Sequence, residues 1–146
     1  MALTSKGIAH WEGDLMSGNG TATLATSGAA GPLPVTWKAR TEEHGSLTSP
    51  EELIAAAHAA CFSMAFSNIL AKAGTPPESL DTEAVATFGP TDAGFRILSI
   101  ALTVTASVPS ISEEDFAAAA EGAKDGCPVS QALKGNVELS VTATLA

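Results

Sequence analysis

Residues 49–74 read SPEELIAAAHAACFSMAFSNILAKAG. We predict that this stretch forms a central helix and that the rest of the chain packs around it. Ser49 is a favourable N-cap, Pro50 suits the first helical position, and Glu52 stands where a capping-box carboxylate binds back to the N-cap. Residues 53–71 carry no charge and are rich in alanine, the strongest helix former. The final glycine of the stretch suits the C′ position. We therefore predict a helix of about 23 residues, about 34 Å long at ~1.5 Å per residue.

An uncharged helix of this length could instead span a membrane. Four polar residues interrupt it: His58, Ser63, Ser67 and Asn68. Because of them, and because no aromatic belt or basic cluster flanks the stretch, we favour a buried core helix. A helix that is apolar on all sides has to be buried on all sides. One chain of this size has difficulty in covering so long a helix, so we predict a homodimer in which both chains contribute their helix to a shared interior.

The composition is that of one globular domain, residues 1–146, with 45% hydrophobic and 16% charged residues. The net charge of −9 disfavours binding to nucleic acid or to an anionic membrane surface. The N-terminal residues MALTSK lack the apolar core of a signal peptide, so we expect a cytoplasmic protein. In that reducing compartment the two cysteines are not expected to form a structural bridge.

Strand-like and helix-like segments alternate along the remaining chain. Strands are predicted at residues 8–12, 21–26, 35–41, 82–88, 95–108 and 137–145. Further helices are predicted at residues 112–125 and, after Cys127-Pro128, to about residue 134. Strands, a buried helix, strands, two helices and a last strand indicate an α+β fold in which mostly antiparallel sheet covers the helices.

The two cysteines are the first candidates for chemistry. Cys61 lies in the middle of the long helix, where a free cysteine is more often an inert apolar residue, because burial raises a thiol pKa. Cys127 precedes Pro128 at a helix start, a position that favours a thiolate but also suits an accidental cap. The two are too far apart for a CxxC motif, so spacing alone leaves both interpretations open.

A buried thiolate at Cys61 would need a fixed cation, and the chain has only two arginines, Arg40 and Arg96. Arg40 falls on the predicted strand 35–41, where alternation puts Trp37 on the opposite face from Arg40. An exposed strand face is the plainer interpretation of this arginine. Glu51 is either an ordinary first-turn carboxylate or, since the capping box uses its neighbour, a group available for a site.

The three histidines, His10, His44 and His58, raise the question of a zinc site with the cysteines. Their spacing matches no metal motif, so we predict no metal. His58, on the buried helix, is better explained as a hydrogen-bonded core histidine.

Four motifs carry a resemblance to a known family. SPEELIAAAHAACFSM at residues 49–64 resembles the signature of the OsmC/Ohr family of thiol-dependent peroxidases, and GCPVSQAL at 126–133 resembles its second cysteine motif. HWEGD at 10–14 and DAGF at 92–95 resemble the OsmC branch, the osmotically inducible proteins. Arg40 aligns with the family arginine, although the residues before it differ. The resemblance covers essentially the whole chain.

The resemblance implies an intertwined homodimer, with mostly antiparallel sheets wrapped around two long central helices. It implies an organic hydroperoxide reductase that acts in oxidative or osmotic stress defence. Cys61 would be the peroxidatic thiolate and Cys127 the resolving thiol, joined in a disulfide during turnover. Arg40 would hold the thiolate, and Glu51 would orient Arg40. A lipoyl-type dithiol would be the reductant, and no cofactor or metal would be needed.

Glu51 and Cys61 are ten positions apart, about 15 Å along a straight helix. Glu51 of the same chain could reach the Cys61 site only if the helix broke. We therefore expect Glu51 to act from the other subunit. Two other functions are kept open: a non-catalytic dimeric module that binds apolar small molecules, and a redox sensor that acts through a partner protein.

Overall fold

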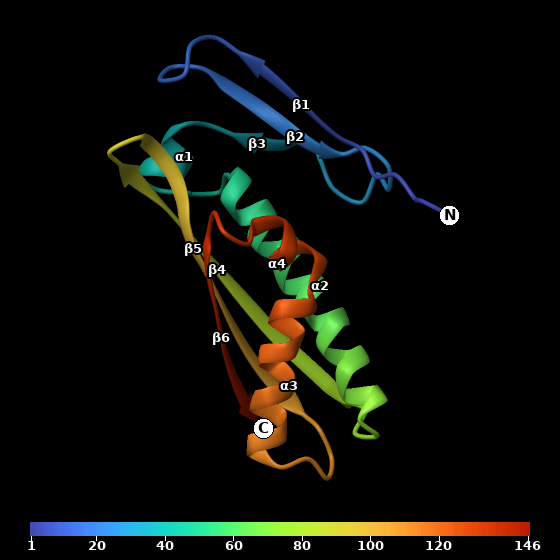
Figure 1. Ribbon diagram of the computed structural model, residues 1–146. Helices are drawn as coiled ribbons and strands as arrows, with labels where there is room; N and C mark the ends of the chain where they lie inside the picture. The colour runs from blue at the N-terminus through green and yellow to red at the C-terminus, as the bar shows by residue number, and fades with distance from the viewer. The chain divides into compact units, whose positions relative to one another are not determined.

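The computed structural model describes residues 1–146 as two compact units, unit 1 (Met1–Pro50) and unit 2 (Glu51–Ala146) (Figure 1). Each unit has its own three-stranded sheet, with strand orders β1-β2-β3 and β4-β5-β6. The predicted α+β class is confirmed. Three of the four strand pairings are antiparallel, as predicted, and β5 with β6 is the parallel one.

Unit 1 is a small antiparallel sheet followed by one helical turn. Its elements are β1 (Gly7–Glu12), β2 (Asn19–Leu24), β3 (Leu33–Val35) and α1 (Lys38–Thr41). Trp11 lies opposite Gly20 in the β1–β2 register. A Cβ at Gly20 would stand 2.7 Å from Cε3 of the Trp11 ring and 2.4 Å from the His10 carbonyl oxygen, so only glycine lets the indole lie flat there.

The predicted strand at residues 35–41 is wrong in its second half. The chain leaves β3 after Val35 and turns into α1. The hydroxyl of Thr36 accepts a hydrogen bond from the Ala39 backbone N–H at 3.2 Å, a local bond that competes with strand pairing. As a result Trp37 and Arg40 do not lie on opposite faces, and the Arg40 guanidinium carbon lies 5.3 Å from the centre of the Trp37 ring.

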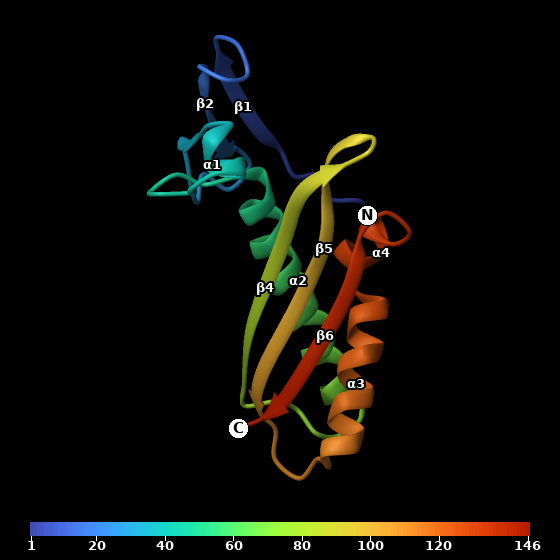
Figure 2. The same ribbon diagram turned by 90° about the vertical axis from the view of Figure 1, so that its left-hand side faces the viewer.

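Unit 2 is a sheet covered on one face by helices (Figures 1 and 2). Strand β4 (Ser79–Thr91) pairs antiparallel with β5 (Gly94–Ser107), and β6 (Glu138–Leu145) runs parallel to β5. Helices α2 (Pro50–Lys72) and α3 (Glu113–Gly126) lie on the same face, and α4 (Pro128–Leu133) follows α3. The strand predicted at residues 82–88 is longer at both ends, and β4 continues past a register shift between Thr87 and Phe88.

The core of unit 2 is formed where β5, α2 and α3 meet. Alternate residues of β5 are buried, as expected for a strand with one covered face. Phe66 on α2 packs against Phe116 on α3 with ring centres 5.1 Å apart. The other buried apolar members of this cluster are Phe62, Leu70, Leu102, Val104, Ala106, Val108, Ala120, Ala123 and Cys127.

The bounds of α2 agree with the prediction. The helix begins at Pro50, directly after Ser49, and ends at Lys72. Gly74 has φ +84°, and the N–H groups of Gly74 and Thr75 bond to the carbonyls of Ala71 and Leu70, which closes the last turn as a Schellman motif.

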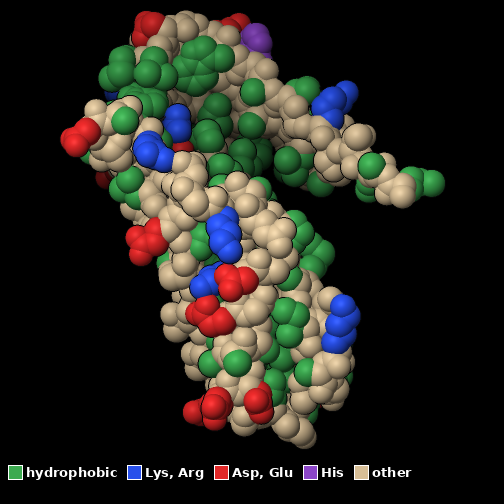
Figure 3. All heavy atoms as spheres, viewed as in Figure 1, with side chains coloured by type: hydrophobic (Ala, Val, Ile, Leu, Met, Phe, Trp, Pro, Cys, Tyr) green, Lys and Arg blue, Asp and Glu red, His purple; other side chains and the backbone are tan.

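Only one face of α2 is covered within a single chain, in keeping with the expectation that one chain of this size has difficulty in covering so long a helix. The buried residues recur at helical spacing: Glu51, Ala55, His58, Phe62, Phe66 and Leu70. On another face Met64 is 68% exposed, and hydrophobic side chains are visible on the α2 side of unit 2 in Figure 3. By length and composition alone α2 would also qualify as a membrane span, a test that core helices of soluble proteins pass as well.

Candidate active site

The two cysteine thiols meet in the interior of unit 2. Cys61 lies in the middle of α2 and is half-buried, whereas Cys127 lies between α3 and α4 and is 0% exposed. Both are free thiols, and each contributes to the pKa shift of the other. Cys61 packs against the same apolar cluster to which Cys127 belongs. The fold therefore brings together two sulfurs that are distant in sequence.

A break between two helices places Cys127. Helix α3 ends at Gly126, and Cys127 adopts an extended conformation, φ −64° and ψ 124°, while its N–H still bonds to the Ala123 carbonyl at 2.9 Å. Pro128 then starts α4, because a missing N–H is harmless at the first helical position. The kink turns the Cys127 side chain into the core instead of along the helix surface.

Burial and hydrogen bonding push the two thiols in opposite directions. Burial raises the pKa of Cys61. A hydrogen bond from the Val129 backbone N–H lowers this pKa, but not enough to cancel the effect of burial. Burial acts on Cys127 in the same sense, but hydrogen bonds from the Ser130 backbone N–H, the Cys61 thiol and the Ser130 hydroxyl outweigh it and lower the pKa of Cys127. Of the two thiols, the fully buried Cys127 is therefore the more acidic.

Two further polar residues join this pair, His58 and Ser130. The imidazole Nε2 of His58 lies 2.7 Å from the Ser130 hydroxyl oxygen, and both side chains are buried. We expected a hydrogen-bonded core histidine at His58, and that is how it is placed. Ser130 was not predicted as a site residue. The signal was present in the spacing: His58 lies one turn before Cys61, and Ser130 lies three positions after Cys127 at the start of α4.

Arg40 lies in unit 1, on α1, and is half-buried. It borders a pocket of about 380 Å³ in that unit. Arg40 and Thr36 are its polar lining residues, and the others are apolar: Trp11, Leu15, Val35, Trp37 and Pro50. The pocket thus combines a cation with indole and aliphatic surfaces, a combination suited to a small ligand with a polar head and an apolar body.

Glu51 lies in the first turn of α2 and is 5% exposed. The helix continues without a break from Pro50 to Lys72, so the ten positions between Glu51 and Cys61 correspond to about 15 Å along the axis. A carboxylate side chain cannot span that distance. Direct contact between Glu51 and Cys61 of the same chain is therefore excluded by the geometry of α2.

No group of three or more His, Cys, Asp or Glu side chains gathers in a way that could hold a metal ion. His10 instead pairs with Glu12 at 3.2 Å on the surface of β1.

Comparisons with known proteins place this geometry in a family. A family model described as OsmC-like protein matches residues 43–142. The protein named Peroxiredoxin OsmC from Escherichia coli (strain K12) is 48% identical over 140 residues, which are 95% of this chain and 96% of that protein. The chain belongs to the OsmC-like protein family.

Two further matches are to proteins named for organic hydroperoxide resistance, one found by sequence and one by structure. A protein named Organic hydroperoxide resistance protein-like 2, from Staphylococcus epidermidis, is 29% identical over 68% of this chain and 70% of that protein. The crystal structure of an organic hydroperoxide resistance protein OsmC from Legionella pneumophila has a TM-score of 0.74 at 23% identity and covers 99% of this chain and 98% of that one. At that identity the structural match shows the fold.

Proposed function

We propose that this OsmC-like chain is a thiol-dependent peroxidase that reduces organic hydroperoxides to alcohols. Turnover passes through a sulfenic acid on Cys61 and a disulfide between Cys61 and Cys127. The observation that carries the proposal is that two free thiols, one half-buried and one fully buried, come together in the core of unit 2. Relatives named Peroxiredoxin OsmC and Organic hydroperoxide resistance protein-like 2 support the same chemistry.

Access assigns the roles of the two cysteines. A hydroperoxide has to reach the attacking sulfur, and Cys61 is partly exposed whereas Cys127 is 0% exposed. Cys127 is therefore the resolving thiol, which needs to meet only Cys61. Its neighbouring backbone and hydroxyl donors suit that role, because they favour its thiolate inside the core.

Arg40 acts as the cation that stabilises the Cys61 thiolate. Within unit 2 the pKa of Cys61 is raised and that of Cys127 is lowered, so attack by Cys61 requires a cation that favours the thiolate on Cys61. A guanidinium suits this because it stays charged when desolvated and can donate to sulfur and to peroxide oxygen together. The apolar lining beside Arg40 favours alkyl or aryl hydroperoxides over hydrogen peroxide.

The reaction balances in three steps. The Cys61 thiolate attacks one oxygen of the O–O bond, the other oxygen leaves with the alkyl group and takes up a proton as the alcohol, and Cys61 becomes a sulfenic acid. Cys127 then attacks the Cys61 sulfur, and water leaves as the disulfide forms. A dithiol reductant reopens the disulfide by exchange and is itself oxidised to a cyclic disulfide. We propose a lipoyl-type dithiol and a cytoplasmic location, where reductants keep both thiols reduced.

The working form is an intertwined homodimer. The exposed face of α2, with Met64 at 68% exposure, leaves apolar area that a second chain would bury. In that dimer Glu51 of one chain orients the arginine at the Cys61 site of the other, which agrees with the 15 Å that separates them along one helix at about 1.5 Å per residue. We propose a role in oxidative or osmotic stress defence, as the family resemblance implies.

Single-turnover and steady-state measurements test the proposal. Reduced protein is mixed with cumene, tert-butyl or hydrogen peroxide, and free thiols are counted with time. Fast loss of both thiols with the organic substrates, reversed by dihydrolipoate, is the expected result. Thiols that survive an excess of every hydroperoxide would overturn it and favour a binding module that uses the pocket beside Arg40. Fast oxidation that small dithiols fail to reverse would favour a redox sensor.

A further inference from the structure

His58 and Ser130 form a buried polar pair behind the cysteines. His58 is 0% exposed and Ser130 is 3% exposed, in an otherwise apolar core. Nε2 of His58 lies 2.7 Å from Oγ of Ser130. Hydrogen bonding by the Ser130 hydroxyl is one cause of the lowered pKa of Cys127. His58, Ser130 and Cys127 are therefore neighbours in one buried cluster, and Cys61 packs against the core that contains Cys127.

The direction of these hydrogen bonds follows from counting protons. A serine hydroxyl has one proton, so when it donates to the Cys127 sulfur it has to accept from His58. A neutral imidazole has one N–H, and burial lowers the pKa of His58 and keeps it neutral. Nδ1 of His58 is buried and has no hydrogen-bond partner. The proton therefore belongs on Nε2, since on Nδ1 it would be a buried N–H without an acceptor.

We propose that His58 is a positioning residue for the resolving step: its Nε2–H holds Oγ of Ser130 so that the hydroxyl proton points at Sγ of Cys127. The inference rests on the proposed peroxidase function. Without His58 the hydroxyl of Ser130 can rotate, and the sulfur loses a donor directed at it. His58 acts only through Ser130 and touches neither sulfur in the reaction.

The step served is attack of Cys127 on the Cys61 sulfenic acid. The electron pair of the Cys127 thiolate forms the S–S bond, the S–O bond of Cys61 breaks, and the leaving hydroxide takes up the proton that Cys127 gave up, forming water. The sulfur of Cys61 is reduced and that of Cys127 is oxidised. Ser130 donates no proton to the product; its O–H lowers the energy of the anion that attacks.

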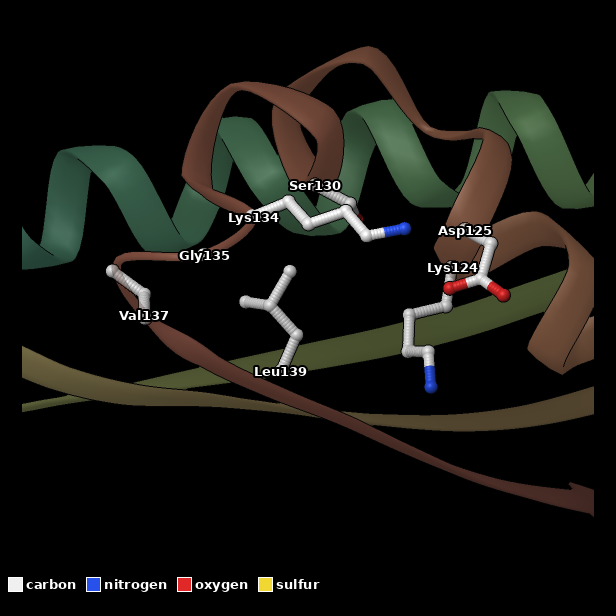
Figure 4. Close-up of a pocket in the computed structure, with 7 residues that line it drawn as sticks. All are labelled: Lys124, Asp125, Ser130, Lys134, Gly135, Val137 and Leu139. Carbon is white, nitrogen blue, oxygen red and sulfur yellow. The ribbon is translucent and has the colours of Figure 1, made fainter.

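Ser130 also borders the solvent side of this arrangement. A pocket of about 210 Å³ is lined by Ser130 together with residues of α3, the turn after α4 and β6, as Figure 4 shows. Its charged residues are Lys124, Asp125 and Lys134, and Lys124 pairs with Glu121 at 2.5 Å. Lys124, Asp125 and Lys134 line the pocket that Ser130 borders, and their charges can change with pH. The pH titration of Cys127 is therefore compared only between variants that keep all three residues.

The test separates resolution from the first oxidation. Full-length wild-type protein and the variants Ser130→Ala, His58→Leu, His58→Gln and the double variant His58→Leu/Ser130→Ala are mixed with one equivalent of cumene hydroperoxide. Thiol alkylation and mass spectrometry follow sulfenic acid and disulfide separately. Ser63→Ala is the matched control, because its hydroxyl bonds Thr82 at 2.8 Å, away from the cysteines.

Loss of the donor is expected to slow disulfide formation about tenfold in Ser130→Ala, as for a hydrogen bond to a charged group. His58→Leu is expected to slow it severalfold, and the double variant to match Ser130→Ala, because His58 acts through Ser130. His58→Gln, whose amide N–H reaches the place of Nε2, is expected to restore most of the rate. Sulfenic acid formation is not slowed in any variant, because a weaker donor to Cys127 leaves the thiolate on Cys61 no less favoured. In a Cys61→Ser background, the thiolate absorbance of Cys127 should titrate at higher pH in Ser130→Ala and His58→Leu.

Unchanged disulfide rates and an unchanged Cys127 titration in Ser130→Ala, with wild-type protein forming the disulfide, would overturn the inference and leave the peroxidase intact. A double variant clearly slower than Ser130→Ala would also overturn it, since His58 would then act independently. Absence of sulfenic acid and disulfide in wild-type protein would instead refute the peroxidase proposal. Should His58→Leu fail to fold, Ser130→Ala and His58→Gln decide the question by the same measurements.

Discussion

Cys61 packs against the apolar core that contains Cys127, although one residue lies in the middle of α2 and the other between α3 and α4. Burial raises the pKa of Cys61, whereas hydrogen bonding lowers the pKa of Cys127, so the buried sulfur is the better anion. For Cys61 to attack a hydroperoxide, the site must therefore favour the thiolate on Cys61 over the one on Cys127. The resolving step, in which Cys127 attacks, benefits from the lower pKa of Cys127.

Replacing either cysteine separates the two halves of the cycle. Cys61→Ser should consume no hydroperoxide, because the remaining sulfur is buried. Cys127→Ser should still lose one thiol in the first turnover but accumulate sulfinic acid under excess cumene hydroperoxide, since nothing condenses with the sulfenic acid. Mass spectrometry of the intact proteins measures both. If Cys61→Ser still consumed hydroperoxide rapidly, Cys61 would not be the attacking thiol.

Arg40 is expected to control the first step. Arg40→Met should slow oxidation of Cys61 by about a hundredfold, the scale for loss of one preorganised charged donor. Arg40→Lys should recover only part of that rate, because an ammonium lacks the planar fork of the guanidinium. Stopped-flow oxidation at limiting hydroperoxide is the measurement. The matched control is Arg96→Met, which removes a guanidinium bonded to the Asn136 side chain on the surface. Equal rates for both variants would refute the role of Arg40.

Glu51 offers a test of the shared site. Glu51→Gln and Cys61→Ser should each be inactive or strongly impaired as homodimers. Unfolding the two together and refolding the mixture should restore activity, because in mixed dimers an intact Glu51 faces an intact Cys61 of the other chain. Mixing without unfolding serves as the control. If the refolded mixture is as inactive as its components, Glu51 does not act across the dimer.

Phe66 is the aromatic centre of the unit 2 core, with ring centres 5.5 Å from Phe62 and 5.1 Å from Phe116. Phe66→Ala should lower the free energy of unfolding by about 3–5 kcal/mol, because it leaves a cavity between α2 and α3. Phe95→Ala is the matched control: Phe95 stacks on Phe88 at 5.4 Å but is 52% exposed, so it should cost about 1 kcal/mol. Urea denaturation measures both, and similar costs would contradict the described core.

His58 should make the protein less stable in mild acid. Burial lowers the pKa of His58 below its ordinary value of 6.5, so the unfolded chain binds a proton that the folded chain refuses. This contribution to stability is fully present above 6.5 and is lost as the pH falls toward the lowered pKa, with a slope of at most about 1.4 kcal/mol per pH unit. Urea denaturation between neutral pH and mild acid should show a flatter profile for His58→Gln. If the stability of wild-type protein and of His58→Gln changed with pH in the same way, His58 would have the same pKa in the folded and unfolded chains, which would contradict this prediction.

The elements that could be predicted were those whose signals are local. The N-cap at Ser49, the glycine at Gly74 and the alternation along β5 depend on neighbours in sequence, and α2 and β5 lie where they were expected. The strand expected through Arg40 failed for a local reason as well, because the Thr36 hydroxyl bonds the Ala39 N–H and stabilises a helical turn. Alternation alone does not reveal that competition.

By itself, the sequence determined the length and ends of α2 and the α+β order of elements, since these follow from helix propensity, capping and periodicity. Its motifs suggested the two cysteines as redox partners only through the family resemblance. Only the tertiary structure decided that both cysteines belong to one core, that Cys127 is the fully buried one, and that His58 pairs with Ser130 beside it. Those relationships depend on how α2, α3 and α4 pack over one sheet face, and burial and hydrogen bonding between elements then set which thiol ionises first.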